Sequence, residues 1–312
     1  MAIRAVDFPE SAETARVADG IRRRVLAHTL RNNGGYLSQA CSSAEILASL
    51  YTGVMRLGPS TAPLVPRPFP GTPGPHNPES FTGAGYNGPR DPALDRFIFS
   101  PVHYALVLYA TLIEVGRLGE HALDDFNQDG STVELIGAEH SPGHEVTAGS
   151  LGQALSQAAG IAVARKRRGD TGRVFVFMSD GELQEGQVWE AFASLSFYEL
   201  DNVVVYVDVN GQCCDGAMRS VMTIEPLAER LSAFGAAVHS VDGHDIPALA
   251  APPCSPHPQQ PLVVLARTDP CRGMPLLESR APRLHYVRFK TEAERHAYEE
   301  RLAGLEAATR KG

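Results

Sequence analysis

Short apolar runs, rich in β-branched residues, alternate with helical patterns in the second half of the chain, and this alternation constrains the fold most strongly. The expected strands are Val174–Met178, Val203–Val209, Ala237–Val241 and Leu262–Ala266. They are apolar on both faces, as in strands that are covered on both sides. Strands that alternate with helices are typical of a parallel sheet. The sequence therefore predicts a doubly wound α/β fold, with a mainly parallel sheet and helices on both faces.

Apolar residues at helical spacing predict the helices. These span Ser11–Arg31, Ser43–Leu57, His103–Val115, Leu151–Lys166, Gln187–Leu200 and Glu225–Phe234, with a charged amphipathic helix at 291–307. The segment NNGGYLSQAC between the first two predicts a turn, because Asn and Gly break helices. Residues 58–92 hold ten prolines, so we expect an irregular excursion that is either packed on the surface or disordered. We expect a single domain over residues 1–312.

Composition excludes several classes of function. The net charge of −8 argues against nucleic acid or anionic membranes as partners. No apolar run approaches the roughly 20 residues of a membrane helix. Charged residues stand near the N-terminus where a secretory signal would be apolar, so we expect a cytoplasmic protein. Five cysteines without C-x-x-C spacing predict neither a disulfide framework nor structural zinc.

Polar residues follow two of the expected strands. Asp180 and Gly181 come after Val174–Met178, and Asn210 comes after Val203–Val209. Ligands of open α/β sheets lie outside the carboxyl ends of the strands, so both groups would reach one edge. Carboxylate and amide oxygens suit Mg²⁺ or Ca²⁺. Gly181 allows close backbone approach to a phosphate, and the following helix offers free N–H groups. The sequence predicts a site for a metal-bound diphosphate.

Structural alternatives exist for these residues. Asp180 could cap a helix at a strand-to-helix turn. Asn210 could be the turn residue before Gly211. His103 could be a packing imidazole at a helix start.

An Asp-Gly pair followed by Asn after the next strand resembles the signature of thiamine-diphosphate enzymes. In that signature the Asp, the Asn and a backbone carbonyl two residues later bind the metal, which implies Asp180, Asn210 and Gln212 as ligands. The stretches SDGELQEGQVWEA, GSLGQALSQAAGIAVA, DRFIFSPVHYALVLY and LAERLSAFGAAVHSVDGHD are similar to transketolase segments in the same order. The resemblance to the N-terminal, diphosphate-binding part of the transketolase family covers most of residues 10 to 250.

The resemblance implies a set of site residues. Those expected to contact thiamine diphosphate or its metal are His103, Gly149, Ser150, Leu151, Asp180, Gly181, Glu182, Asn210, Gln212 and His285. Of these, His103 and His285 would be catalytic and would handle protons and developing negative charge. Glu185 and Glu190 look like the family's interface glutamates, and a solvated helix face is their alternative.

The chain departs from the family at two histidines expected to face the substrate. Tyr36 stands where a Gly-His-Pro-Gly-Gly-Ser segment has its histidine, and Leu135 falls near the place of a second one. His140 and His144 lie close to Leu135 in the sequence and are candidates to replace it. Tyr36, His140 and His144 are therefore the expected substrate residues, and we expect an unusual donor or acceptor.

Full transketolases resemble three consecutive modules, and this chain corresponds to the first. The second module supplies the glutamate that activates the cofactor ring. The resemblance therefore implies the diphosphate-binding subunit of a two-chain enzyme, an α2β2 heterotetramer, that transfers a two-carbon ketol unit from a sugar or sugar phosphate. One alternative passes the unit to a lipoyl or carrier-protein thiol, as in pyruvate-dehydrogenase-like enzymes. A second alternative is a non-catalytic regulatory homologue.

Overall fold

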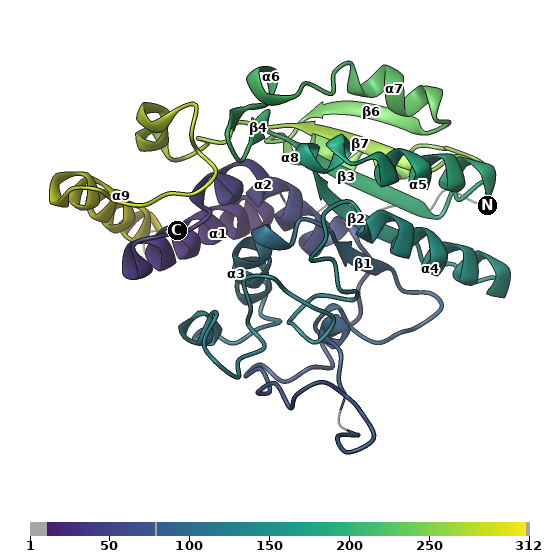
Figure 1. Cartoon of the computed structure of the whole chain (residues 1–312), viewed down its shortest axis with the longest axis horizontal. Helices are drawn as coiled ribbons and strands as arrows, with labels where there is room; N and C mark the ends of the chain where they lie inside the picture. Colours follow the sequence, from purple (N-terminus) through teal and green to yellow (C-terminus); the bar gives the residue numbers. More distant parts are fainter. Residues whose placement is uncertain (1–10, 79, 310–312) are drawn as a thin grey trace.

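The computed structural model describes residues 11–78 and 80–309. Its centre is a five-stranded sheet in the order β1-β2-β3-β7-β6, in which every pairing is parallel (Figure 1). The strands are β1 Arg96–Phe99, β2 Val174–Ser179, β3 Val203–Val209, β6 Ala237–Asp242 and β7 Leu262–Arg267, and a two-stranded antiparallel hairpin is formed by β4 Gln212–Cys213 and β5 Gly216–Ala217.

Helices flank the sheet. They are α1 Ser11–Asn32, α2 Leu37–Ser49, α3 Ala105–Glu114, α4 Ala154–Arg168, α5 Gly186–Phe197, α7 Leu227–Ala233 and α8 Ile246–Ala250. Helix α6 Met218–Val221 contacts the hairpin, and helix α9 Glu292–Thr309 packs on α1. A π-helical turn, Leu50–Val54, continues α2. None of the helices in the described part of the chain is long and apolar enough to span a membrane.

Side chains of the strands alternate between two cores, one on each face of the sheet. On one face, Phe175 and Tyr206 pack with α1, α2, α3 and α8. On the other face, Val176 and Val205 pack with α4, α5 and α7. The sheet is buried on both sides because the strands carry apolar residues at successive positions. The predicted fold class, a doubly wound α/β fold with helices on both faces, is confirmed (Figure 1).

Three local predictions were wrong. Helix α2 begins at Leu37 and not at Ser43, because Leu37–Ser42 are all buried and the left-handed Asn33 already turns the chain. Helix α4 begins at Ala154 and not at Leu151, because Gly152 has a φ of +79° and interrupts any earlier helix. Strand β1 was not expected, since only four residues form it between irregular segments.

The excursion at 58–92 packs on the surface of the molecule. Its backbone forms hydrogen bonds with a second irregular segment, residues 115–153 between α3 and α4. Gly119 N–H donates to Leu64 O at 2.8 Å, and Phe69 N–H donates to Gly130 O at 2.8 Å. Gly83 N–H donates to Glu139 O at 2.7 Å. The two segments form a layer of loops beside α3 and β1 (Figure 1).

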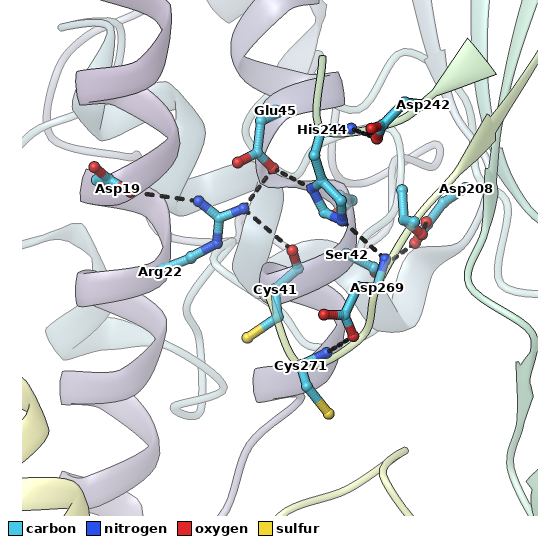
Figure 2. A network of polar contacts seen from close by, with 12 residues as sticks. Asp19, Arg22, Cys41, Ser42, Glu45, Asp208, Asp242, His244, Asp269 and Cys271 are labelled. Carbon is cyan, nitrogen blue, oxygen red and sulfur yellow. Dashed lines mark hydrogen bonds and ion pairs between the residues drawn. The ribbon is translucent and has the colours of Figure 1, made fainter. Parts of the chain in front are cut away.

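A buried polar network ties α1 and α2 to the loops that follow β6 and β7 (Figure 2). Arg22 donates to Glu45 and to the carbonyl of Cys41. His244 Nδ1 lies 3.0 Å from Glu45 Oε2, and its Nε2 accepts the Asp269 N–H at 2.8 Å. Since Nε2 accepts, the proton of a neutral His244 is on Nδ1 and is donated to Glu45. The network fixes these loops at the carboxyl edge of the sheet.

Candidate active site

Asp180 and Asn210 meet at the carboxyl edge of two neighbouring strands. Asp180 opens a short 3₁₀ helix, Asp180–Gln184, directly after β2, and Asn210 follows β3. Asp180 Oδ2 accepts the N–H of Gly211 at 2.8 Å, and Asn210 Oδ1 accepts the N–H of Gln212 at 2.9 Å. The structure therefore brings the three predicted metal ligands together.

The oxygens of this group fit a hard cation. Asp180 Oδ1 is buried and has no hydrogen-bond partner among the described residues, and the same is true of Gln212 Oε1. Burial, with the nearby charge of Asp208, raises the pKa of Asp180 to about 8. A buried carboxylate oxygen without a partner is costly, and a bound cation would offset that cost. Carboxylate, amide and carbonyl oxygens are the ligands that Mg²⁺ and Ca²⁺ prefer.

Asp208 is a site residue that the sequence analysis missed. It is fully buried on β3, and its carboxylate accepts hydrogen bonds from Ser42 at 2.6 Å, Thr268 at 2.5 Å and Tyr104 at 3.1 Å. Asn210 Nδ2 donates to the same carboxylate at 3.1 Å and to Tyr104 Oη at 3.0 Å. These contacts fix the amide of Asn210, so its Oδ1 faces Gln212. The sequence feature that could have identified Asp208 is an acidic residue inside an otherwise apolar strand.

The predicted cofactor loop lies against the turn that carries Asp180. Glu182 is fully buried, and its carboxylate accepts the N–H groups of Ser179 at 2.9 Å and Gly152 at 3.0 Å and the hydroxyl of Ser100. Because both oxygens of Glu182 are used inside the protein, only its backbone remains for the predicted cofactor contact. Gly149, Ser150 and Leu151 immediately precede Gly152 and are exposed.

Tyr36, His103 and His285 form an aromatic cluster, called here the histidine cluster. Ring centroids are 5.8 Å apart for Tyr36 and His103, 5.4 Å for Tyr36 and His285, and 5.2 Å for the two histidines. The ring of His103 also lies 4.7 Å from that of Tyr104, whose hydroxyl contacts Asn210. The cluster is thus continuous with the predicted metal site.

Both histidines of the cluster are neutral at neutral pH. Burial, and then the neighbouring His285, lower the pKa of His103 to about 3. Burial also lowers the pKa of His285, against an opposing effect of Asp215. A neutral imidazole can donate one hydrogen bond and accept another.

His140 and His144 do not join the histidine cluster. His140 Nε2 lies 3.0 Å from Glu134 Oε2, and its ring stacks on Phe69. His144 is buried beside Phe99 and Tyr109, and burial lowers its pKa to about 4. The structure gives neither histidine a contact with Tyr36.

Tyr36 and Leu135, the two positions that depart from the family, line one cavity of about 250 Å³. Other lining residues are His28, Asn32, Phe126 and Tyr286. Burial, followed by Arg31, lowers the pKa of His28 to about 4, so it is neutral as well. Among the described residues that line this cavity there is no Lys, Arg, Asp or Glu.

Comparison with known proteins supports the same family. Residues 81–280 match the family model described as transketolase, thiamine diphosphate binding domain. A transketolase family protein of Sinorhizobium fredii, y4mO, is 36% identical over 282 residues, which cover 86% of this chain and 90% of that protein. One of the subunits of apulose-4-phosphate transketolase from Actinobacillus succinogenes is 30% identical over 288 residues, which cover 90% of this chain and 94% of that relative.

Among solved structures, transketolase from Campylobacter jejuni superposes with a TM-score of 0.70 at 19% identity, over 96% of this chain and 48% of that one. At that identity the likeness establishes the fold alone. The chain spans about half of the Campylobacter enzyme and nearly all of the Actinobacillus relative. The family match over most of the chain and the relatives aligned nearly end to end agree: this chain belongs to the transketolase family.

Proposed function

We propose that this chain is the diphosphate-binding subunit of a two-chain, transketolase-like enzyme that transfers a two-carbon ketol unit from a ketose donor. The observation that carries the proposal is the buried, unpartnered Oδ1 of Asp180 beside Asn210 and Gln212. A protein gains little stability from such an oxygen, and a cation bound there would give it a partner, which supports the proposal. The histidine cluster supports the proposal as well, because the ring of His103 lies 4.7 Å from that of Tyr104, whose hydroxyl contacts Asn210.

In this proposal Asp180 Oδ1, Asn210 Oδ1 and the carbonyl of Gln212 bind Mg²⁺ or Ca²⁺, which anchors the diphosphate. Beyond its own chain neighbours, no described residue has an atom within 4 Å of the position that a Cβ on Gly181 would take, which leaves room for a phosphate. Gly149, Ser150 and Leu151 would contact the cofactor through backbone groups. Thiamine diphosphate, when bound, supplies a carbon nucleophile for the ketose carbonyl. His103 and His285 would donate hydrogen bonds to oxygens that gain negative charge.

A separate partner chain would complete the site. The Actinobacillus relative is named as one of the subunits of a transketolase, and this chain spans about half of the transketolase from Campylobacter. Apolar side chains are exposed around the predicted diphosphate site: Leu151, whose carbonyl accepts from Gln187, and Met222, whose carbonyl accepts from Gln184. In this proposal the partner chain covers both groups. Glu185 and Glu190 would lie in it, within an α2β2 assembly.

Two kinds of acceptor are compatible with the family. One relative is named for apulose 4-phosphate and another for 6-deoxy-6-sulfo-D-fructose. Both sugars are ketoses with an anionic end, so such a ketose is the first candidate for the donor, and an aldose is the first candidate for the acceptor. The cavity beside Tyr36 and Leu135 has no Lys or Arg among its described lining residues for such an end, which favours a carrier-protein or lipoyl thiol as the second candidate. Mass spectrometry of a carrier after incubation with both chains and ketose separates them, because a sugar-to-sugar enzyme leaves the carrier unmodified.

The direct test is reconstitution with a chain that carries the pyrimidine-binding module. With xylulose 5-phosphate as donor probe and ribose 5-phosphate as acceptor probe, the two chains together should release an aldose two carbons shorter than the donor and form a ketose two carbons longer than the acceptor, while each chain alone should not. Full turnover by this chain alone would contradict the two-chain proposal. A reconstituted pair that binds thiamine diphosphate and cleaves no ketose would instead favour the regulatory alternative.

A further inference from the structure

Gln39 lies on α2 directly beside His285. Its Nε2 donates to the backbone carbonyl of His285 at 3.0 Å and lies 3.3 Å from His285 Nδ1. Gln39 is only 3% exposed. The neighbouring Ser38 hydroxyl donates to Leu284 O at 2.8 Å and lies 3.0 Å from Gln39 Oε1. The single proton of that hydroxyl can serve only one of these two oxygens, so it is the contacts with His285 that hold the NH₂ end of the Gln39 amide.

These contacts determine where His285 carries its proton. A carbonyl oxygen can only accept a hydrogen bond, so the NH₂ group of Gln39, and not its oxygen, faces His285. The same NH₂ group carries a second hydrogen and lies 3.3 Å from Nδ1. Since this nitrogen only donates, a hydrogen bond between the two requires Nδ1 to present its lone pair. In a neutral imidazole the proton is then on Nε2. His285 Nε2 has no hydrogen-bond partner in the described part of the chain.

Among the described residues, no other neighbour of His285 determines which of its ring nitrogens carries the proton. Tyr36 meets the ring edge-on, with an interplanar angle of 88°, and forms no hydrogen bond with it. His103 is tilted at 37° and is neutral. Asp215 acts on His285 only through its charge.

We propose that Gln39 is a positioning residue that holds His285 as the Nε2–H tautomer, so that His285 serves as a hydrogen-bond donor to a substrate oxygen and not as a proton acceptor. The inference rests on the proposed function, because it assigns His285 a role in that reaction. Donors that are fixed before the reaction stabilise developing negative charge without reorganisation.

The tautomer can be measured in the cofactor-free chain by two-bond ¹H–¹⁵N correlation spectra of ¹⁵N-histidine-labelled protein at neutral pH. The His285 signals are assigned from their loss in His285→Gln. The wild-type chain should show a protonated Nε2 and an unprotonated Nδ1.

Gln39→Glu should invert this pattern, since a carboxylate accepts from Nδ1, and should raise the pKa of His285. Gln157→Glu is the matched control, because Gln157 also donates to a backbone carbonyl but touches no histidine.

A wild-type His285 with its proton on Nδ1 would overturn the proposal, as would an unchanged spectrum in Gln39→Glu. With the partner chain present, Gln39→Glu should lower kcat roughly 100-fold at little change in KM, and Gln157→Glu should not. An inverted tautomer with unchanged kcat would also overturn the role. Thiamine-diphosphate binding by the wild type is measured separately. If the wild type binds the cofactor but the tautomer result fails, only this inference is wrong; if the wild type does not bind the cofactor, the proposed function is wrong.

Discussion

At the residue scale, Asp208 controls how Asn210 presents its oxygen to the predicted metal. Its carboxylate accepts from Ser42, Thr268, Tyr104 and Asn210. In Asp208→Asn one acceptor oxygen is replaced by an NH₂ group, so the groups that donate to that oxygen must reorient or lose their partner. We expect a loss of about 1–3 kcal/mol in the free energy of unfolding, measured by urea titration. We also expect weaker Mg²⁺-dependent binding of thiamine diphosphate, measured by calorimetry.

Asp201→Asn is the control for this prediction. Asp201 forms a surface ion pair with Lys166 at 2.9 Å, and such pairs contribute at most about 1 kcal/mol. If Asp208→Asn bound the cofactor as tightly as Asp201→Asn, the account of Asn210 would be wrong.

The sequence predicted the site residues at the edge of the sheet, but it did not predict the buried residues that hold them in position. Asp180, Asn210 and Gln212 follow neighbouring parallel strands, so strand order alone brings them to one edge. Asp208, Tyr104 and Gln39 act through partners distant in the sequence, such as Ser42 for Asp208 and His285 for Gln39. No periodicity or spacing encodes those contacts. They depend on how α2 packs over the sheet, and the start of α2 was itself predicted six residues too late.

At the scale of elements, Glu45 joins α1, α2 and the loop after β6 (Figure 2). Burial opposes its ionisation, but the His244 hydrogen bond and the charge and hydrogen bond of Arg22 outweigh burial and lower its pKa. The side chains of Arg22 and Glu45 are 5% and 10% exposed. Glu45→Gln should leave the buried Arg22 charge with the exposed Asp19 as its remaining carboxylate partner among the described residues, and should cost up to about 3 kcal/mol in the free energy of unfolding at neutral pH, measured by urea titration.

The pH dependence of this difference follows from the lowered pKa. A carboxyl whose pKa is lower in the folded state stabilises the fold above its unfolded pKa, and that stabilisation is lost as the pH falls through the folded value. The advantage of the wild type over Glu45→Gln should therefore shrink below about pH 4.3. Glu120→Gln, which removes an exposed partner of Arg24, should show no such dependence. A constant difference down to acid pH would contradict the assignment.

Strands β2, β3, β6 and β7 were predicted to within one residue. Strands β2, β3 and β7 carry long apolar runs, whereas β6 is an edge strand that carries two valines. Strand β1 pairs only with β2 and has four residues, too few for a pattern to stand out from the loops beside it. Its place in the sheet is set by tertiary contacts such as Glu145 Oε1, which accepts the N–H of Phe97 at 2.9 Å.

At the scale of the whole molecule, the predicted partner should cover the exposed apolar groups beside the diphosphate site. Met222 is 55% exposed there, and Leu64, on the excursion, is 56% exposed. Met222→Asp should weaken association with the partner chain by about 2 kcal/mol or more, measured by analytical ultracentrifugation. Leu64→Asp is the matched control and should associate normally. Equal affinities for the two variants would place the partner elsewhere.

The central claim is that Asp180, Asn210 and Gln212 hold a metal-bound diphosphate. Calorimetric titration of thiamine diphosphate into this chain, with Mg²⁺ and the partner chain present, tests it most directly. Binding should require Mg²⁺, should be abolished by EDTA, and should weaken roughly 100-fold or more in Asp180→Ala but not in Asp201→Asn. Absence of binding by the wild type, or equal binding by Asp180→Ala, would contradict the account.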